Sequence, residues 1–205
     1  MIRYAPRLAA IAALALALGG CITLFPKEEP EQLYRFGSDA QPAPASETAR
    51  YSVLEDAIGF DRLASTDRIL TVDGDQVAYI KGGRWAVPAP LMFESSVRRA
   101  FDGSGGPDRL IVAGEASRPD FVLKLDVLRF EARYEQGPAS APTVVIRIRA
   151  ALNRGPDHAL ISQKTFEVKV PTSDNRVSAI ATGFDQATSQ MLGQVVQWVA
   201  GNTGG

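Results

Sequence analysis

The stretch FVLKLDVLRFEARY, residues 121–134, decides the fold class of this chain. In its first half every second residue is apolar, which is the pattern of a β-strand that buries one face. From Leu128 onward the alternation continues on the opposite parity. A strand changes the face that it buries only through an extra residue, so the slip predicts a β-bulge or bend near Val127–Leu128.

The residues that follow extend this strand into a small sheet. Apolar residues alternate again from Val144 to Ala150 and from Phe166 to Val170, and short polar loops separate the stretches. Three such strands in succession predict an antiparallel meander. Apolar residues then recur at helical spacing over residues 177–199, which is about six turns. This amphipathic helix is expected to cover one face of the sheet.

Shorter elements are predicted ahead of the long strand. Pro88 and Pro90 suit the first turn of a helix, where a missing N–H costs nothing, and the glycine-rich residues 102–107 end that helix. Asp73-Gly74-Asp75 is typical of a hairpin turn. The strands expected around it are Tyr51–Ile58, Arg68–Val72 and Gln76–Ile80.

These patterns together predict a single α/β domain. Its sheet is expected to be mixed but mostly antiparallel, with packed helices that include the long C-terminal amphipathic one. The expected organisation is a signal peptide at 1–20, a lipidated N-terminus and Pro-rich tether at 21–50, the domain at 51–200, and a flexible tail at 201–205.

The amino-acid composition excludes several classes of protein and of binding partner. The 205 residues are 45% hydrophobic and 22% charged, with a formal net charge of −1. Such values exclude a disordered chain, a collagen-like fibre and a multi-span membrane protein. The mild acidity argues against a nucleic-acid partner, which would select clustered Lys and Arg. Cys21 is the only cysteine, so the chain can form no internal disulfide. With one cysteine and one histidine in the whole sequence, the usual zinc sites of three or four Cys and His ligands are excluded.

The N-terminus predicts a bacterial lipoprotein. Arg3 and Arg7 precede an apolar core at residues 8–18, which is shorter than the roughly 20 residues that a membrane-spanning helix needs. Leu18-Gly19-Gly20-Cys21 then matches a lipobox. Cys21 is therefore expected to carry a covalent diacylglycerol and an N-acyl chain, a combination that anchors a protein stably. The alternative is a soluble secreted protein with a chance cysteine at the cleavage point.

The residues around the anchor suggest where the protein resides. Ile22 follows the cysteine in place of the Asp that favours inner-membrane retention in enterobacterial lipoproteins, so the outer membrane, facing the periplasm, is expected. Residues 23–50 contain four prolines and predict an extended tether that can reach up to about 90 Å. Within it, Leu33-Tyr34-Arg35-Phe36 can form a short first strand.

The sequence predicts no enzyme. His158, the only histidine, lies in the turn 155–158, and no Gly-x-Ser-x-Gly elbow accompanies it. A hydrolase that uses His158 is one alternative. Arg147 and Arg149 share one strand face, which is either a solvated surface or a contact for an anionic partner. No metal site is expected.

Several features, in order, resemble the ABC-type transport auxiliary lipoproteins, whose best-known branch is the paraquat-inducible C-type lipoprotein. The most specific is Tyr79, followed six residues later by Trp85 and then by the helix that Pro88 opens. The lipobox, the short strand at 33–36, the long strand, the paired strands and the closing helix match in order. One departure is the segment Gly59–Ala64, which replaces a Leu-Pro and Tyr-Leu-Asp-Arg segment of that branch.

The resemblance implies a non-catalytic partner of an ABC permease and ATPase and of a mammalian-cell-entry (MCE) type substrate-binding protein, in phospholipid traffic between the two membranes. Homo-oligomers are compatible with such an assembly. Tyr79, Arg84 and Trp85 are candidate partner contacts, although Trp85 can instead pack against the following helix. The alternative function is an independent periplasmic carrier or chaperone that holds lipid inside the domain.

Overall fold

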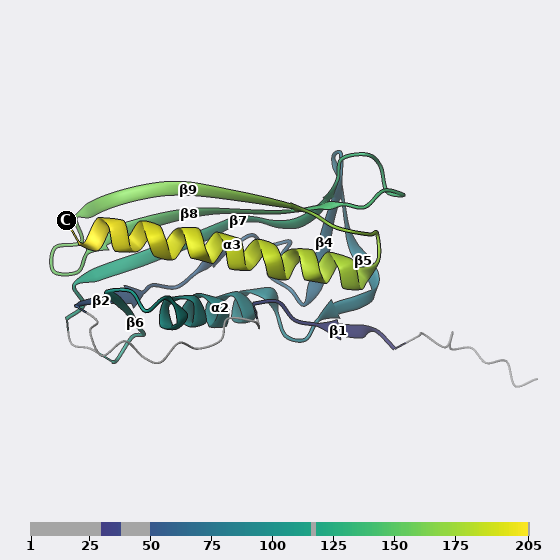
Figure 1. Ribbon diagram of the computed structural model, residues 1–205. Coiled ribbons are helices and arrows are strands. Elements are labelled where there is room, and N and C mark those ends of the chain that lie inside the picture. Colours follow the sequence, from purple (N-terminus) through teal and green to yellow (C-terminus); the bar gives the residue numbers. More distant parts are fainter. Residues whose placement is uncertain (1–29, 38–49, 116–117, 205) are drawn as a thin grey trace, which may run out of the picture. The chain divides into compact units, whose positions relative to one another are not determined.

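The long strand expected at residues 121–134 is present as β7 (Phe121–Tyr134) and organises the sheet. The computed structural model describes residues 30–37, 50–115 and 118–204, so the predicted leader and Cys21 lie outside the described residues. Residues from Glu31 to Gly205 form one compact unit, and its order of elements confirms the predicted single α/β domain (Figure 1). The remaining elements are β1 (Gln32–Tyr34), β2 (Tyr51–Glu55), β3 (Gly59–Phe60), β4 (Arg68–Asp73), β5 (Gln76–Trp85), α2 (Ala89–Ser104), β6 (Asp108–Ile111), β8 (Thr143–Arg154), β9 (Leu160–Pro171) and α3 (Val177–Thr203).

The antiparallel meander is confirmed. β7 pairs with β8 along almost its whole length, and β8 pairs in the same way with β9. The register of β7 against β8 shifts between Val127 and Arg129, which is the bulge expected from the change of parity. The extra residue, Leu128, keeps Leu125 and Phe130 on the same buried face.

The other edge of β7 carries the parallel part of the sheet. β2, β3 and β4 each pair with it in parallel, and β1 and β6 extend the sheet through parallel pairs with β5 and β2. Each parallel pairing covers only two to four residue pairs, so the sheet is mixed and mostly antiparallel. Neither β3 nor β6 was predicted, because both are too short to show alternation.

The hairpin of β4 and β5 has the predicted turn, with Gly74 in the left-handed region at a φ of 56°. β5 is longer than the predicted strand at 76–80, because it continues through Lys81 and two glycines to Trp85. Gly82 has a φ of 80°, and the β4–β5 register shifts nearby. The glycine allows a bend that a side chain would resist, so the strand continues where the sequence suggests a break.

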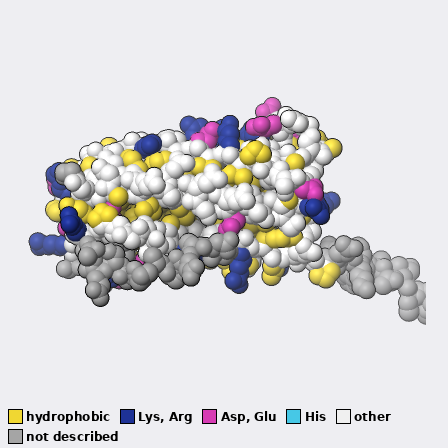
Figure 2. Space-filling model, in the orientation of Figure 1, with side chains coloured by type: hydrophobic (Ala, Val, Ile, Leu, Met, Phe, Trp, Pro, Cys, Tyr) yellow, Lys and Arg dark blue, Asp and Glu magenta, His cyan; other side chains and the backbone are white. Residues whose placement is uncertain are grey.

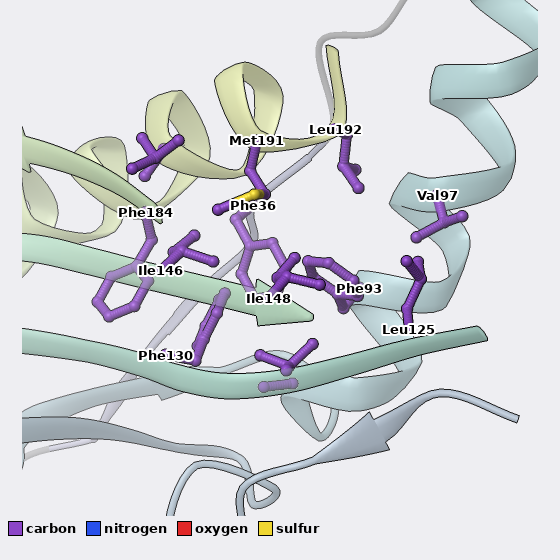
Figure 3. Close-up of a cluster of buried hydrophobic side chains, with 14 of the residues drawn as sticks. Phe36, Phe93, Val97, Leu125, Phe130, Ile146, Ile148, Phe184, Met191 and Leu192 are labelled. Atoms are coloured by element: carbon purple, nitrogen blue, oxygen red, sulfur yellow. The ribbon is translucent and has the colours of Figure 1, made fainter. Parts of the chain in front are cut away.

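Helix α3 covers one face of the sheet, as expected, and runs along β8 and β9 (Figure 1). The core lies between them, and its side chains from α2, α3, β7 and β8 point toward one another (Figure 3). Phe130 is central to it, with its ring centroid 4.7 Å from that of Phe184 and 5.0 Å from that of Phe36. These aromatic pairs add to the stabilisation that comes from area burial.

Helix α2 begins after Pro88 and ends at Ser104, with Gly105 in a left-handed conformation as its C-cap. Its buried face, which includes Phe93 and Val97, packs into the same core. The proline start and glycine stop follow the sequence prediction. Because α2 also packs against α3, the two helices lie on the same side of the sheet (Figure 1).

The folded unit extends beyond both ends of the predicted domain. At the N-terminal side, β1 pairs with β5 and Phe36 is only 1% exposed, so the fold begins well before residue 51. At the other end, α3 continues to Thr203, whose buried hydroxyl donates to the Val199 carbonyl at 3.2 Å. Residues 201–203 are therefore helical rather than part of a flexible tail. Tertiary packing sets the two ends of the folded unit, and local sequence patterns do not reveal that packing.

Candidate functional site

Tyr79 and Arg84, two of the three residues predicted to contact a partner, meet around the start of β4. Arg84 Nη1 lies 3.1 Å from Asp67 Oδ2, and Arg84 Nε lies 3.4 Å from Glu31 Oε2. The guanidinium carbon of Arg68 lies 4.1 Å from the centroid of the Tyr79 ring. The Arg84 side chain is about half exposed, 47%, whereas Tyr79 is half-buried and its hydroxyl donates to the Leu63 carbonyl at 3.0 Å.

Trp85 does not join them at the surface. It is 1% exposed and packs edge-on against Phe36 and Phe184, with ring centroids 5.0 Å and 5.2 Å away. Of the two interpretations of this residue, packing within the fold is the one that the structure supports. Trp85 therefore supports the Tyr79 and Arg84 cluster from the core side and is not itself available for direct contact.

A groove of about 600 Å³ lies between α2 and α3. Figure 2 shows hydrophobic side chains gathered along the line between these two helices, over the C-terminal half of α3. Many of the residues that line the groove are small. The apolar and small residues that line it are Ala100, Gly103, Leu192, Gly193, Val196 and Ala200.

Arg99 marks one end of this groove. Its Nε donates to the Gly37 carbonyl at 2.9 Å, and its Nη2 donates to Ser96 Oγ at 3.2 Å. The hydroxyl of Thr188, which lines the groove and is fully buried, has no hydrogen-bond partner within the described part of the chain. The one charged residue among the described residues of the lining is therefore at this end.

A second hollow, of about 500 Å³, lies on the other side of Arg99. Arg35 and Arg99 both line it, together with the exposed apolar side chains of Val87 and Leu91. Among the residues that the structure describes, no carboxylate lies within ion-pair distance of either arginine. Two cations thus flank a partly apolar depression, and Arg99 lines both this depression and the groove.

Burial shifts the pKa of two acidic side chains elsewhere in the fold. Burial raises the pKa of the Glu55 carboxyl, and a hydrogen bond and the charge of Arg98, whose Nε lies 3.1 Å from it, oppose this effect. Burial also raises the pKa of the Asp108 carboxyl, against a hydrogen bond with Thr203. They come from β2 and β6 and are separate from the groove between the helices.

The structure adds no catalytic partner to His158, which is exposed in a turn at a φ of 55°. Within the described ranges no three His, Cys, Asp or Glu residues are placed to hold a metal ion. Arg147 and Arg149 form ion pairs at 3.9 Å with Glu167 and at 2.7 Å with Asp126. Such cross-strand pairs are typical of a solvated sheet face.

Comparison with known proteins identifies the family. A model described as the ABC-type transport auxiliary lipoprotein component matches residues 34–196. The chain belongs to this family. The match confirms the resemblance drawn from the lipobox, Tyr79 and Trp85, and it spans the fold from β1 into α3. A search of curated proteins found no significant match. No helix within the described residues is long and apolar enough to cross a membrane.

Solved structures show the same fold. The chain is 29% identical to protein XCC0632 from Xanthomonas campestris, with a TM-score of 0.73, covering 83% of this chain and 95% of that one. It is 11% identical to the hypothetical protein CT253 from Chlamydia trachomatis, with a TM-score of 0.53, covering 75% and 98%. An uncharacterised protein at 13% identity has a TM-score of 0.66, covering 83% and 99%. The two more distant likenesses concern the fold alone.

The sequence did not single out the groove or its arginines. Its only trace is the spacing of small residues on the apolar stripes of the two helices, such as Ala100 with Gly103, and Gly193 with Ala200. Small residues at helical spacing indicate close packing as readily as open space. Only the arrangement of α2 against α3 distinguishes the two cases.

Proposed function

We propose that this family member is a non-catalytic lipoprotein subunit of an MCE-type ABC transport system that moves lipids between the inner and outer membranes. The family match over residues 34–196 is the observation that carries the proposal. An auxiliary subunit needs a membrane anchor and a binding surface, and it needs no catalytic base.

The anchor in this proposal is Cys21. Its diacylglycerol and N-acyl chain would hold the protein on the outer membrane, and the Pro-rich residues would set how far the domain reaches from that membrane. The pairing of β1 with β5, and the buried ring of Phe36, give the tether a firm attachment to the fold. A force applied to the tether would therefore be transmitted to the domain core.

The docking surface in this proposal includes Tyr79 and Arg84. Exposed aromatic and arginine side chains are enriched where proteins bind one another. Leu33, which is adjacent to Arg84 in the β1–β5 register and 59% exposed, adds an apolar side chain beside them. The ion pairs of Arg84 with Asp67 and Glu31 hold its guanidinium in place before a partner arrives.

A pull-down tests the proposal. Tagged full-length protein would be purified from detergent-solubilised membranes, beside a Cys21→Ala variant, and co-purifying proteins identified by mass spectrometry. We expect an MCE-domain protein together with an ABC permease and ATPase, and much lower recovery with the Cys21→Ala variant, which lacks the anchor.

Recovery of the acylated protein alone, from a preparation whose lipidation is verified by its intact mass, would contradict the proposal. That outcome would favour the independent lipid carrier. An unchanged recovery with Cys21→Ala would retain the transport partner but remove the anchor from the mechanism.

A further inference from the structure

We propose that the groove between α2 and α3 binds one long-chain fatty acid, with its carboxylate at Arg99 and Arg35 and its hydrocarbon chain along the groove. This site does not depend on docking to a transporter. It rests on the groove's size, the distribution of its polar groups and the position of the two arginines.

The dimensions of the groove suit a small ligand. Its volume of about 600 Å³ lies within the range of small-molecule sites and is small for a folded protein segment. A Cβ added at Gly193 would meet no atom within 4 Å, so the helix surface there faces open space. The groove therefore has room for one chain, and Gly193 is not packed against the neighbouring helix.

Arg99 is the one charged residue among the described residues that line the groove. Along α3 the lining runs from Thr188 and Ser189 through Leu192 and Val196 to Gln197 and Ala200. Twelve residues of helix span about 18 Å, a length that accommodates much of an extended hydrocarbon chain. A lining whose only charge lies at one end, beside an apolar stripe of Leu192, Val196 and Ala200, matches an amphiphile with one charged head and one tail.

The positive charge of Arg99 favours a ligand with a carboxylate head group. Arg99 uses two of its N–H groups on Gly37 and Ser96, and a guanidinium has five, so further donors remain. The carboxylate of Asp185 accepts a hydrogen bond from the Gly37 backbone N–H, and among the described residues no ion pair joins it to Arg99. Arginine recognises carboxylates through paired, charge-assisted hydrogen bonds.

Arg35 strengthens this assignment, because it brings a second cation to the hollow that Arg99 also lines. The hydroxyl of Thr188 is a further polar group in the groove that lacks a partner within the described residues. A buried hydroxyl without a partner is uncommon, and a ligand head group or an ordered water would satisfy it.

Photo-crosslinking of the acylated full chain tests the site. The protein would be placed in phosphatidylcholine nanodiscs that contain photoactivatable palmitate, irradiated, and its labelled peptides mapped by mass spectrometry. We expect labelling on α2 and α3.

Gly193→Trp, which fills the groove, should lower that labelling about tenfold. Gly201→Trp is the matched control, because it adds the same side chain to α3 where open space lies outside the groove, and it should label normally.

The head group has its own test. Arg99→Gln should lower palmitate labelling about tenfold, the loss expected when a hydrogen bond to a charged group disappears. Photoactivatable hexadecanol, which lacks the carboxylate, should label the wild-type groove about tenfold less than palmitate. Thermal unfolding of each variant at the wild-type temperature would establish that the fold is intact.

Equal labelling of the wild type and Gly193→Trp would overturn the proposal, as would labels spread over the whole surface. Stronger labelling by a photoactivatable phosphatidylglycerol than by palmitate would replace the single-chain ligand with a phospholipid. Crosslinks between two copies of the chain through α2 and α3, in place of lipid labelling, would make the groove a self-association surface.

Discussion

Phe36 lies edge-on against Trp85, with ring centroids 5.0 Å apart and ring planes at 82°. Phe36 follows the short strand β1 and Trp85 ends β5, so the contact joins the segment around β1 to the hairpin that precedes α2. Both rings also approach Phe130 of β7, at 5.0 Å and 6.3 Å. The segment that leads out of the tether is therefore part of the core.

Phe36→Ala should strongly destabilise the domain. Removing a buried phenylalanine ring costs about 3–5 kcal/mol of unfolding free energy. Leu33→Ala, in the same segment but 59% exposed, should change it by less than about 0.5 kcal/mol. Urea unfolding of the detergent-solubilised full chain, followed by tryptophan fluorescence, measures both. Similar losses for the two variants would mean that the segment does not pack as described.

Arg84→Ala and Tyr79→Ala should weaken recovery of the transport partner in the pull-down while leaving the fold intact. The ion pairs of Arg84 are exposed, so their removal should cost no more than about 1 kcal/mol of stability. Arg149→Ala is the matched control, since it removes an exposed arginine with its own ion pair to Asp126. If all three variants recover the partner equally, the docking surface lies elsewhere.

Asp108 and Asp120 should affect stability with opposite dependence on pH. Burial raises the pKa of Asp108, so its favourable contribution is present below about pH 4 and is lost as the pH rises through its folded value. Hydrogen bonds from Ser52 lower the pKa of Asp120, so its contribution is present above about pH 4 and is lost as the pH falls.

Substitution by asparagine makes the comparison measurable. At pH 7, Asp108→Asn should raise the melting temperature and Asp120→Asn should lower it, and both differences should shrink toward pH 3. Scanning calorimetry across that range checks the signs. A rise for Asp120→Asn at pH 7 would show that its hydrogen bonds with Ser52 do not stabilise the native state.

Two glycines of α3 should respond oppositely to alanine. A Cβ at Gly183 would lie 2.9 Å from Thr172 Cγ2 and 3.0 Å from Val144 Cγ2, so Gly183→Ala should push the helix from the sheet and cost about 1–3 kcal/mol. Gly193 has open space, so Gly193→Ala should add about 0.5–1 kcal/mol through helix propensity. Chemical unfolding measures both, and equal effects would contradict the close helix–sheet contact.

The meander and the C-terminal helix could be predicted because their patterns are long. Fourteen residues of β7 carry enough alternation to reveal both the strand and its bulge. The short strand expected at residues 33–36 is present as β1 at Gln32–Tyr34, whereas two-residue β3 carries no alternation, and β5 continues through two glycines that locally favour a turn. Short parallel pairings depend on which neighbours the long strand brings near, and this information is not local.

The candidate site was only partly predictable, for a related reason. Tyr79 and Arg84 were singled out, but burial of Trp85 depends on rings from β1 and α3 that are far away in sequence. Arg35 and Arg99 come from separate segments and border one hollow only after folding. Sequence patterns indicate which face of an element is apolar, whereas a groove depends on the distance between two such faces.

The parallel pairing of β1 with β5 has a mechanical consequence. A force that pulls Gln32 along its strand axis, away from Tyr34, loads the hydrogen bonds between the two strands together, because they resist sliding in shear. A force perpendicular to the strand would break them one at a time. The buried ring of Phe36, packed against Trp85, adds resistance at the end of β1. The direction of the force therefore decides how much tension the domain withstands before β1 detaches.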